Sequence, residues 1–532
     1  MAHQPPERRD PNDLDAWILG SGIGSLTAAV HLIQEANVPP SRIHILEALE
    51  LAGGGTATCG DPVNGYHYRA GAMPMFIDAW MERLLSLVPS KVDPKKTVLD
   101  MMETNRSKPP AEKLHTRFLA RKASGVERIN TKDIRLGLRD HMDLLRLGFK
   151  SEGSLGRSRI NDYFHKTFFQ SDYWLLLATT YVSLTNGFTR DYTDDNRFGF
   201  QPWHSLAEFR RYTQHFRNGT HGLDRACQLY VGRYNAHESV IAPLADFLLS
   251  RGVHFRFRTT VTDIIFEPSH QQVSTICAVP ENEPATTIKV RQQDVVIVSG
   301  GSVISGATTG TNESPPSLEL MECDKNLDDN WLLWLELSSK DSKFGNPYNF
   351  CTRVGESRQE SFTVTLKNNT QFFERFVQLT GDEPGTGTFV TLKHSSWLLT
   401  LSLPQQPMFP DQPVDVQVFW GYAAFPEKEG DYVKKPMLEC SGEEIMTEIL
   451  HHLQFPTEGI LPGSITIPCV MPRKSAPLLR RDGSDRPLVV PDGMRNMAMI
   501  GHFVEIPNEV PVSMDYCVRG AQMAINHLMG LG

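Results

Sequence analysis

The chain is 532 residues long, more than one ordinary domain holds, so two or three lobes around more than one core are expected. Hydrophobic residues make up 40% and charged residues 22% of it, as in ordinary globular proteins. The net charge of −9 gives no electrostatic basis for nucleic-acid binding.

The two ends of the chain and its cysteines favour a soluble cytoplasmic protein. Residues 1–13 form a polar, proline-rich tail without the apolar stretch of a secretory signal, and residues 528–532 carry no lipidation or peroxisomal signal. The most apolar later run, residues 174–184, is too short to span a bilayer. The eight cysteines form no CxxC pair, so no metal site and no disulfide framework are indicated. These features do not exclude transient contact with a membrane surface.

The first predicted unit, residues 14–75, contains a strand, a glycine-rich turn, a helix and a second strand. The apolar run 16–19 enters the turn, an apolar helical pattern follows it, and the strand 43–46 ends at Glu47. This order is typical of a dinucleotide-binding unit. The alternative is a glycine-rich turn that binds nothing, and the presence of both strands, the helix and the acid argues against it.

The small residues of this unit have separate roles in the expected site. Gly20 allows the tight turn, Gly22 lets the backbone approach a pyrophosphate, and the small Ser25 lets helix and strand pack closely. The helix N-terminus offers free N–H groups and a positive dipole end to the phosphates. Glu47 is expected to accept hydrogen bonds from a ribose hydroxyl. The second glycine turn, Gly53-Gly54-Gly55, favours FAD over NAD.

Residues 76–237 are expected to form a mostly helical lobe over the substrate. Residues 80–88 are amphipathic with helical spacing. Residues 161–225 are rich in aromatic side chains, and core packing accounts for most of them. The alternative for some is that they line a pocket for an apolar substrate. The polar stretch 185–197 is expected to be a surface loop.

The rest of the chain alternates between the cofactor domain and the substrate lobe. Residues 238–302, with a glycine-stopped helix and a buried strand, return to the FAD-binding domain. Residues 303–435 are a strand-rich part of the substrate lobe. Residues 436–532 are assigned to the C-terminal part of the FAD-binding domain, with a capping box at Ser441 and a last strand ending at Gly501.

The predicted fold class is therefore α/β, an FAD-binding doubly wound (Rossmann-like) domain with a mixed α+β substrate lobe and a helical lobe. Its cofactor site draws on both ends of the chain, because the closing helix is expected to point its N-terminus at the cofactor. The expected cofactor-binding residues are Gly20, Gly22, Ser25, Glu47, Gly54, Gly55, Gly71, Gly501 and Ser513.

Nine stretches, taken together and in this order, resemble the FAD-binding oleate hydratases, also called the myosin-cross-reactive antigen family. They are Ile18–Leu26, Arg42–Glu47, Phe200–Ser205, Glu208–Tyr212, Arg233–Ser239, Phe419–Tyr422, Lys428–Met437, Asp485–Pro491 and Ile500–Pro507. The resemblance implies FAD held without net redox turnover, a free long-chain unsaturated fatty acid as substrate, and addition of water across an isolated double bond.

The resemblance also places two residues of the family's mechanism. The tyrosine that delivers a proton to the alkene corresponds to Tyr212, for which a core-packed tyrosine is the alternative. The glutamate that positions the water corresponds to Met73, and the arginine before it corresponds to Ala72. A thioether cannot take a proton. The chain thus departs from the family at the water-activating position.

Three functions remain open on the sequence alone. The first is hydration of an unsaturated long-chain fatty acid. The second is flavin-dependent isomerisation or redox chemistry on a related apolar substrate, which Met73 keeps in view. The third is non-catalytic binding of flavin or lipid. The expected partners are a fatty acid or similar apolar molecule and a second copy of the chain in a homodimer.

Overall fold

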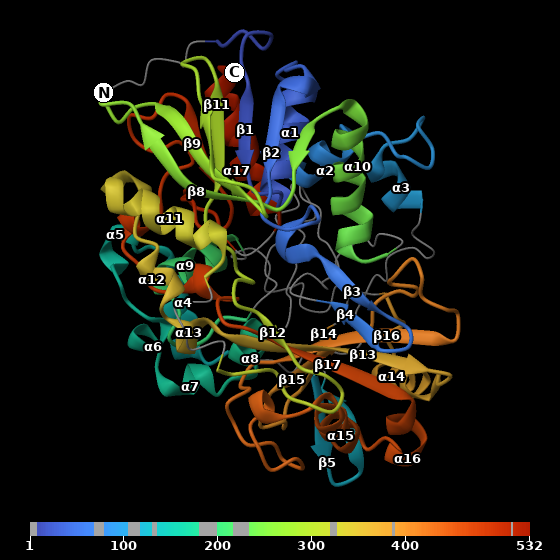
Figure 1. Ribbon diagram of the computed structural model, residues 1–532. Coiled ribbons are helices and arrows are strands. Elements are labelled where there is room, and N and C mark those ends of the chain that lie inside the picture. The colour runs from blue at the N-terminus through green and yellow to red at the C-terminus, as the bar shows by residue number, and fades with distance from the viewer. Residues whose placement is uncertain are drawn as a thin grey trace.

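The computed structural model describes residues 8–68, 79–104, 118–129, 136–179, 199–215, 234–319, 327–385, 389–511 and 514–531. Within these ranges two sheet-based halves lie one above the other in Figure 1, and a group of short helices, drawn partly in teal, lies beside them. The N- and C-terminal ends of the chain both lie at the top, in the half that contains the glycine-rich turn.

The upper half is built on a five-stranded sheet in which every neighbouring pair of strands is parallel. Its order is β18 (Met497–Ile500), β11 (Val295–Ser299), β1 (Ala16–Leu19), β2 (Ile43–Leu46) and β7 (His254–Arg256). The central strands are almost wholly apolar, as strands buried on both faces must be. The carboxyl ends of these strands meet at one edge of the sheet, where open α/β folds bind ligands.

Helices and a small antiparallel sheet enclose this parallel sheet. The helices include α1 (Ile23–Gln34), α2 (Ala79–Ser86), α3 (Val98–Thr104), α10 (Ala242–Arg251), α11 (Asp329–Lys340) and α17 (Met514–Met529). The small sheet is β10 (Thr286–Lys289), β9 (Val273–Pro280) and β8 (Thr259–Phe266). Apolar side chains from all these elements form one buried core. Gly252, with φ +92°, ends α10 as the sequence predicts.

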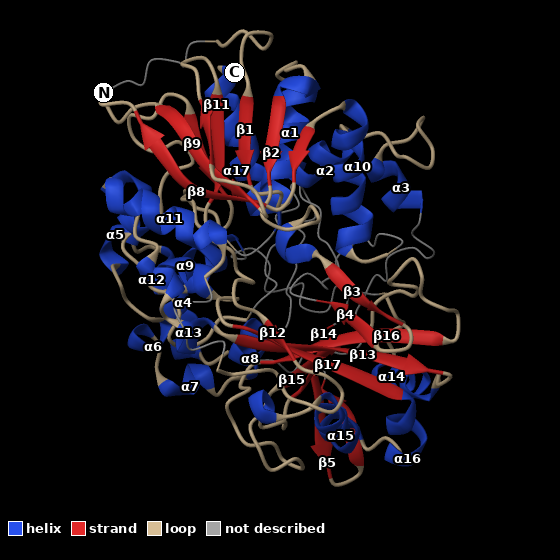
Figure 2. Cartoon of the chain, in the orientation of Figure 1, coloured by secondary structure: helices blue, strands red, loops and turns tan. Residues whose placement is uncertain are grey.

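The lower half is an eight-stranded sheet with helices beneath it (Figure 2). Its order is β12 (Thr308–Thr309), β17 (Ser464–Met471), β13 (Gln359–Lys367), β16 (Val416–Ala423), β15 (Leu399–Ser402), β14 (Phe389–Leu392), β5 (Phe118–Lys122) and β6 (Gly125–Ile129). The helices are α14 (Gln371–Thr380), α15 (Gly442–Leu453) and α16 (Thr457–Ile460).

The two faces of the long strand β13 show how the halves are joined. Phe362, Val364 and Leu366 point into the core shared with α14 and α15. The alternate side chains Thr363 and Thr365 accept hydrogen bonds from backbone N–H groups of the hairpin formed by β3 (Thr58–Asp61) and β4 (Gly65–Tyr68), at 3.2 and 2.9 Å. This hairpin follows the glycine turns in sequence, so it carries the chain from the upper half to the lower one.

The structure corrects three expected assignments. Residues 303–435 are expected to belong to the substrate lobe, but α11 packs in the core of the upper half. Residues 76–237, expected to be mostly helical, also contain the β5–β6 hairpin, which extends the eight-stranded sheet. Residues 436–532 are expected to belong to the FAD-binding domain, but α15 and β17 within them belong to the lower half. The physical reason is that β17 and β13 pair across about a hundred residues of sequence, and no local pattern specifies such a partner.

The lateral helices surround a buried aromatic cluster. They are α4 (Leu138–Gly148), α5 (Glu152–Leu155), α6 (Ile160–Tyr163), α7 (Lys166–Phe169), α8 (Asp172–Thr179) and α9 (Leu206–His215). Two further short helices are α12 (Tyr348–Cys351) and α13 (Val354–Ser357), and Phe350 and Cys351 of α12 pack in the core of the upper half. The aromatic cluster contains Phe164, Phe168, Trp174, Phe200, Phe209 and Tyr212, packed with Leu478 and Val510 among others. Most of these aromatic side chains are thus core residues. No helix in the described ranges is long and apolar enough to cross a membrane.

Candidate cofactor site

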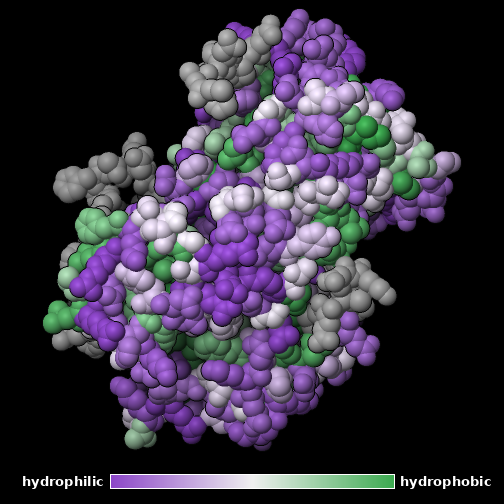
Figure 3. Space-filling view, turned by 90° about the vertical axis from the view of Figure 1, so that its left-hand side faces the viewer, coloured by the Kyte–Doolittle hydropathy of each residue, from purple (hydrophilic) through white to green (hydrophobic). Residues whose placement is uncertain are grey.

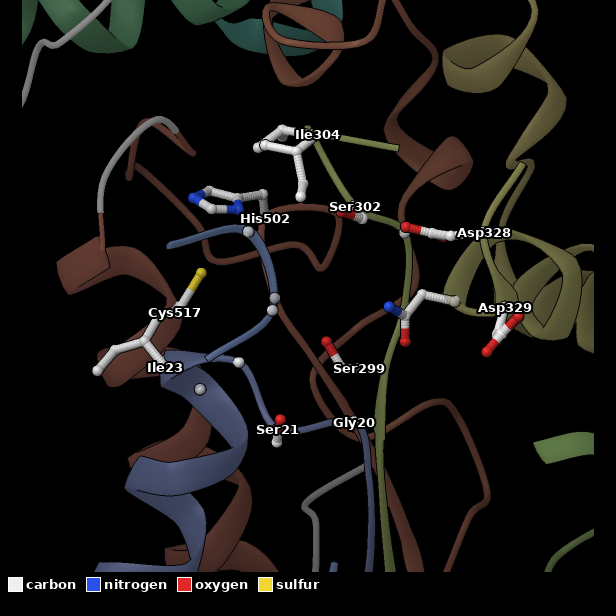
Figure 4. Close-up of a pocket in the computed structure, with 18 of the residues that line it drawn as sticks. Gly20, Ser21, Ile23, Ser299, Ser302, Ile304, Asp328, Asp329, His502 and Cys517 are labelled. Atoms are coloured by element: carbon white, nitrogen blue, oxygen red, sulfur yellow. The ribbon is translucent and has the colours of Figure 1, made fainter. Parts of the chain in front are cut away.

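A pocket with a volume of about 300 Å³ opens at the carboxyl edge of the parallel sheet. The turns after β1, β2 and β11 form its floor and sides, and the N-terminal part of α17 closes it with Met514 and Cys517. Figure 4 shows Gly20 and Ser21 at one end of the pocket and Ile304 at the other. Several crossovers of the chain meet here, as at the ligand sites of other doubly wound sheets.

The two glycine turns lie against each other and leave room for a phosphate-bearing ligand. Gly20 has φ +98°, a left-handed conformation that a residue with a Cβ adopts only with strain. Gly22 has φ −66° and begins α1, and an added Cβ there would meet no other described atom within 4 Å. The backbone N–H of Gly53 donates to the carbonyl of Ser21 at 2.9 Å. A pyrophosphate can therefore approach the bare backbone at the N-terminus of α1.

Glu47, at the end of β2, is held by hydrogen bonds from the glycine turn. Its Oε2 accepts from the backbone N–H of Ser21 at 2.7 Å and from the Ser21 hydroxyl, and its Oε1 accepts from the backbone N–H of Leu49 at 2.9 Å. The carboxylate lines the pocket. Because each carboxylate oxygen has two lone pairs, Oε1 can also accept from a ribose hydroxyl.

An acidic pair faces the pocket from the side opposite His502 and Cys517 (Figure 4). Asp328 caps α11, its Oδ1 accepting from the backbone N–H of Trp331 at 3.2 Å. Burial raises the pKa of Asp328 to about 6, although this hydrogen bond opposes the rise. Asp329 accepts from the hydroxyl of Thr260 at 3.1 Å. This side of the pocket therefore offers acceptors for ligand hydroxyl or amino groups.

The predicted cofactor residues come together only in part within the described ranges. Gly20, Gly22, Glu47, Gly54, Gly55 and Gly501 line the pocket. Ser25 does not line it; it is buried, with its Oγ 3.8 Å from where a Cβ on Gly20 would lie. Gly71, Ala72, Met73, the 185–197 loop and Ser513 lie outside the described residues.

Sequence reasoning missed the pocket residues Asp328, Asp329, Lys474 and His502. The one local signal for the acidic pair is an N-cap aspartate at the start of a helix, which indicates a helix end rather than a ligand. Lys474 adds a positive charge to the wall, but its loop reaches the pocket only through the tertiary fold.

Tyr212 does not line the pocket, yet its surroundings adjoin the wall. The side chain is only 1% exposed, and its ring centroid lies 5.3 Å from that of Phe200. Leu478 belongs both to the aromatic cluster and to the pocket wall, and Val510 of the cluster precedes the wall residue Pro511. The backbone N–H of Ser205, just before α9, donates to the carbonyl of Leu478 at 2.9 Å.

The pocket fits FAD on these observations. The two glycine turns and the start of α1 suit its pyrophosphate, and Glu47 suits a ribose. The second glycine turn, Gly53–Gly55, also lines the pocket.

Comparison with known proteins finds relatives in sequence and neighbours in structure. Oleate hydratase from Streptococcus pyogenes serotype M49 (strain NZ131) is 30% identical over 532 residues, covering 97% of this chain and 86% of that protein. Linoleate hydratase from Lactiplantibacillus plantarum is 26% identical, covering 97% and 94%. The structure of cyclohexylamine oxidase from Brevibacterium oxydans IH-35A shares the fold, with a TM-score of 0.54 at 12% identity, covering 97% of this chain and 99% of that one. The MCRA family model matches residues 13–526. The chain therefore belongs to the MCRA family.

Proposed function

We propose that this protein is an FAD-dependent hydratase that adds water to a double bond of an unsaturated long-chain fatty acid. The names of both hydratase relatives support the reaction and the substrate class. The structural observation that carries the proposal is the sharing of Leu478 between the pocket wall and the aromatic cluster of Tyr212. A buried apolar environment thus adjoins the cofactor site.

Tyr212 is the proposed proton donor to the alkene. An unperturbed phenol has a pKa of about 10, so it protonates an alkene only where the two are held together and water is excluded. The burial of Tyr212 among aromatic rings meets the second condition. FAD, when bound, contributes a flavin ring that shapes and polarises the site. Gly20 and Gly22 would hold the pyrophosphate of FAD, and Glu47 would hold a ribose.

The sequence leaves open which group orients the attacking water, because Met73 stands where the family has a glutamate. A hydratase with Met73 must orient its water by another group. Replacing Met73 with Glu restores the carboxylate, and a higher hydration rate in this variant would support the family's arrangement of the site.

The test is incubation of FAD-loaded protein with oleate and with linoleate, followed by mass spectrometry for products heavier by one water. Tyr163→Phe is the matched control for Tyr212→Phe, because it removes a phenol from the same helical group, where Tyr163 donates to the carbonyl of Asp143 at 3.2 Å. Migrated double bonds or a substrate-reduced flavin, without hydration, would make the protein an isomerase or oxidoreductase. Binding without any conversion would leave a non-catalytic flavin and lipid protein.

Homodimerisation, transient membrane contact and a cytoplasmic location stay predictions. One described surface suits an apolar contact: α4 and the residue after it expose Leu138 (89%), Met142, Leu145 and Phe149 (77%) at helical spacing. Figure 3 shows this side of the molecule, where separate apolar patches interrupt a mostly hydrophilic surface. Light scattering tests the dimer, and co-sedimentation with lipid vesicles tests the membrane contact.

A further inference from the structure

A network of buried charges lies between α9 and the loops that continue from the pocket wall. Glu208 and Arg211 belong to α9. Arg481 and Arg486 follow the wall residues Pro477 and Leu478, and Glu505 follows the wall residue His502. All five are buried or nearly so. The network therefore joins the helix that carries Tyr212 to two separate parts of the cofactor pocket.

Glu208 is the centre of this network. Its Oε1 accepts from Nε of Arg481 at 3.0 Å and lies 3.1 Å from Nη1 of Arg486. Arg481 also donates from Nη2 to Oε2 of Glu505 at 2.7 Å. The Glu208 carboxylate on α9 thus contacts two guanidinium groups from the loop after the pocket wall. The second acid, Glu505, connects this loop to the loop that follows His502.

Arg211 completes the network on the other side of α9. It binds Glu152 through two hydrogen bonds of 2.6 and 2.8 Å, donates to Glu505, and donates to the carbonyl of Glu509 at 3.1 Å. Three arginines and three glutamates therefore balance one another, and Glu152, with 33% of its side chain exposed, lies at the outer edge of the network. Burial alone would raise the pKa of Glu208, but the charges of the three arginines lower it to about 2. Glu208 is a carboxylate at every physiological pH.

A second set of hydrogen bonds holds the start of α9 against the same pocket wall. His204 is buried, and burial lowers its pKa to about 3, so its ring is neutral. Its Nδ1 accepts from the backbone N–H of Gln201 at 3.0 Å, which leaves the hydrogen on Nε2. That nitrogen lies 3.3 Å from the hydroxyl of the wall residue Ser475. With the bond from Ser205 to Leu478, the helix start is held at two points of the wall.

Such a network can fix the position of α9, although it adds little to the stability of the fold. Apolar contacts around α9 are non-directional, so the aromatic cluster by itself allows small rotations or shifts of the helix. Buried ion pairs add little net stability over apolar packing, because desolvation offsets their attraction. Guanidinium–carboxylate pairs are directional, however. Glu208 and Tyr212 are four residues apart on one helix and therefore share a face.

We propose that Glu208 is a positioning residue which, through Arg481 and Arg486, fixes the register of α9 and thereby the place of Tyr212 beside the cofactor pocket. Tyr212 as the proton donor rests on the proposed function above; the positioning of Tyr212 does not. The substitution Glu208→Gln keeps the shape of the side chain and removes its charge. We expect Tyr212 to shift relative to the wall while the fold persists.

The experiment places 3-fluorotyrosine at position 212 of the full FAD-loaded chain and records its fluorine NMR shift and titration midpoint. Glu208→Gln is expected to move both. Glu448→Gln is the matched control, because Glu448 is also wholly buried but accepts from the backbone N–H groups of residues 431–433 in the other half. Arg481→Lys, which keeps the charge and loses the planar fork, gives a second, milder perturbation. An unmoved signal in both network variants, or an equal movement in the control, would overturn the proposal.

Turnover provides the second readout. Glu208→Gln is expected to lower kcat by on the order of 10²-fold with little change in KM, as a small misplacement of a reacting group does. Adding it to Tyr212→Phe should cost nothing more, since both act through one phenol. If the loss of kcat in the double variant equals the product of the two single losses, Glu208 does not act through Tyr212 and the positioning role is wrong. A wild-type protein that adds no water refutes the hydratase instead, and the NMR result still decides the network.

Discussion

Gly22→Ala tests whether the first glycine turn exists for a ligand or for the fold. Gly22 has φ −66° and ψ 174°, values that alanine adopts without strain, and an added Cβ meets no other described atom within 4 Å. Losing glycine's freedom in the unfolded chain stabilises by about 0.4–1 kcal/mol. Alanine is a poorer N-cap than glycine by about 0.5–1 kcal/mol. These two effects nearly cancel, so the melting temperature without FAD should hardly change.

Cofactor affinity should fall, because the new methyl group projects into the space where the pyrophosphate approaches the backbone. Overpacking by one methyl costs about 1–3 kcal/mol, which corresponds to roughly 5- to 150-fold in Kd. Titration of the FAD-free protein with FAD, followed by flavin fluorescence, measures the change. Gly148→Ala is the control, since it too has no described atom within 4 Å of the added Cβ and lies on α4, away from the pocket. Wild-type affinity in Gly22→Ala would refute the phosphate role of this turn.

Three further changes have defined outcomes. Glu47→Gln should weaken FAD binding by about 1.5–3 kcal/mol, the worth of a hydrogen bond to a charged acceptor, and equal Kd values in the same titration would exclude the ribose role. Tyr212→Phe should lower hydration by about 10²- to 10⁴-fold with FAD binding intact, whereas Tyr163→Phe should not. Glu360 is buried without a hydrogen-bond partner among the described residues, and burial raises its pKa well above 4.5 in the folded state. Its contribution to stability is therefore complete below the unfolded pKa and is lost as pH rises through the folded pKa. Glu360→Gln should be more stable than wild type in urea at pH 8 and lose that advantage near pH 4; an advantage independent of pH would show that Glu360 is not the titrating group.

Much of the cofactor site follows from local sequence. The turn Gly20–Gly24, the helix α1 and the acid Glu47 lie within one continuous unit, so spacing alone specifies how they meet. The same holds for the capping box at Ser441, where the side chain accepts from the backbone N–H of Glu444 and that carboxylate accepts in return. The position of Gly501 before the closing helix is also readable, because an apolar strand leads directly into it.

The tertiary structure alone decided which distant residues complete the site. Asp328 and Lys474 reach the pocket from loops hundreds of residues beyond the glycine turn, and nothing in their local sequence marks a ligand. Glu208 meets Arg481 across 273 residues. The pairing of β17 with β13 likewise moved residues 464–471 out of the expected cofactor part. Helix and turn signals are short-range because they arise from backbone geometry within a few residues, whereas strand partners and buried charge pairs are chosen by packing in three dimensions.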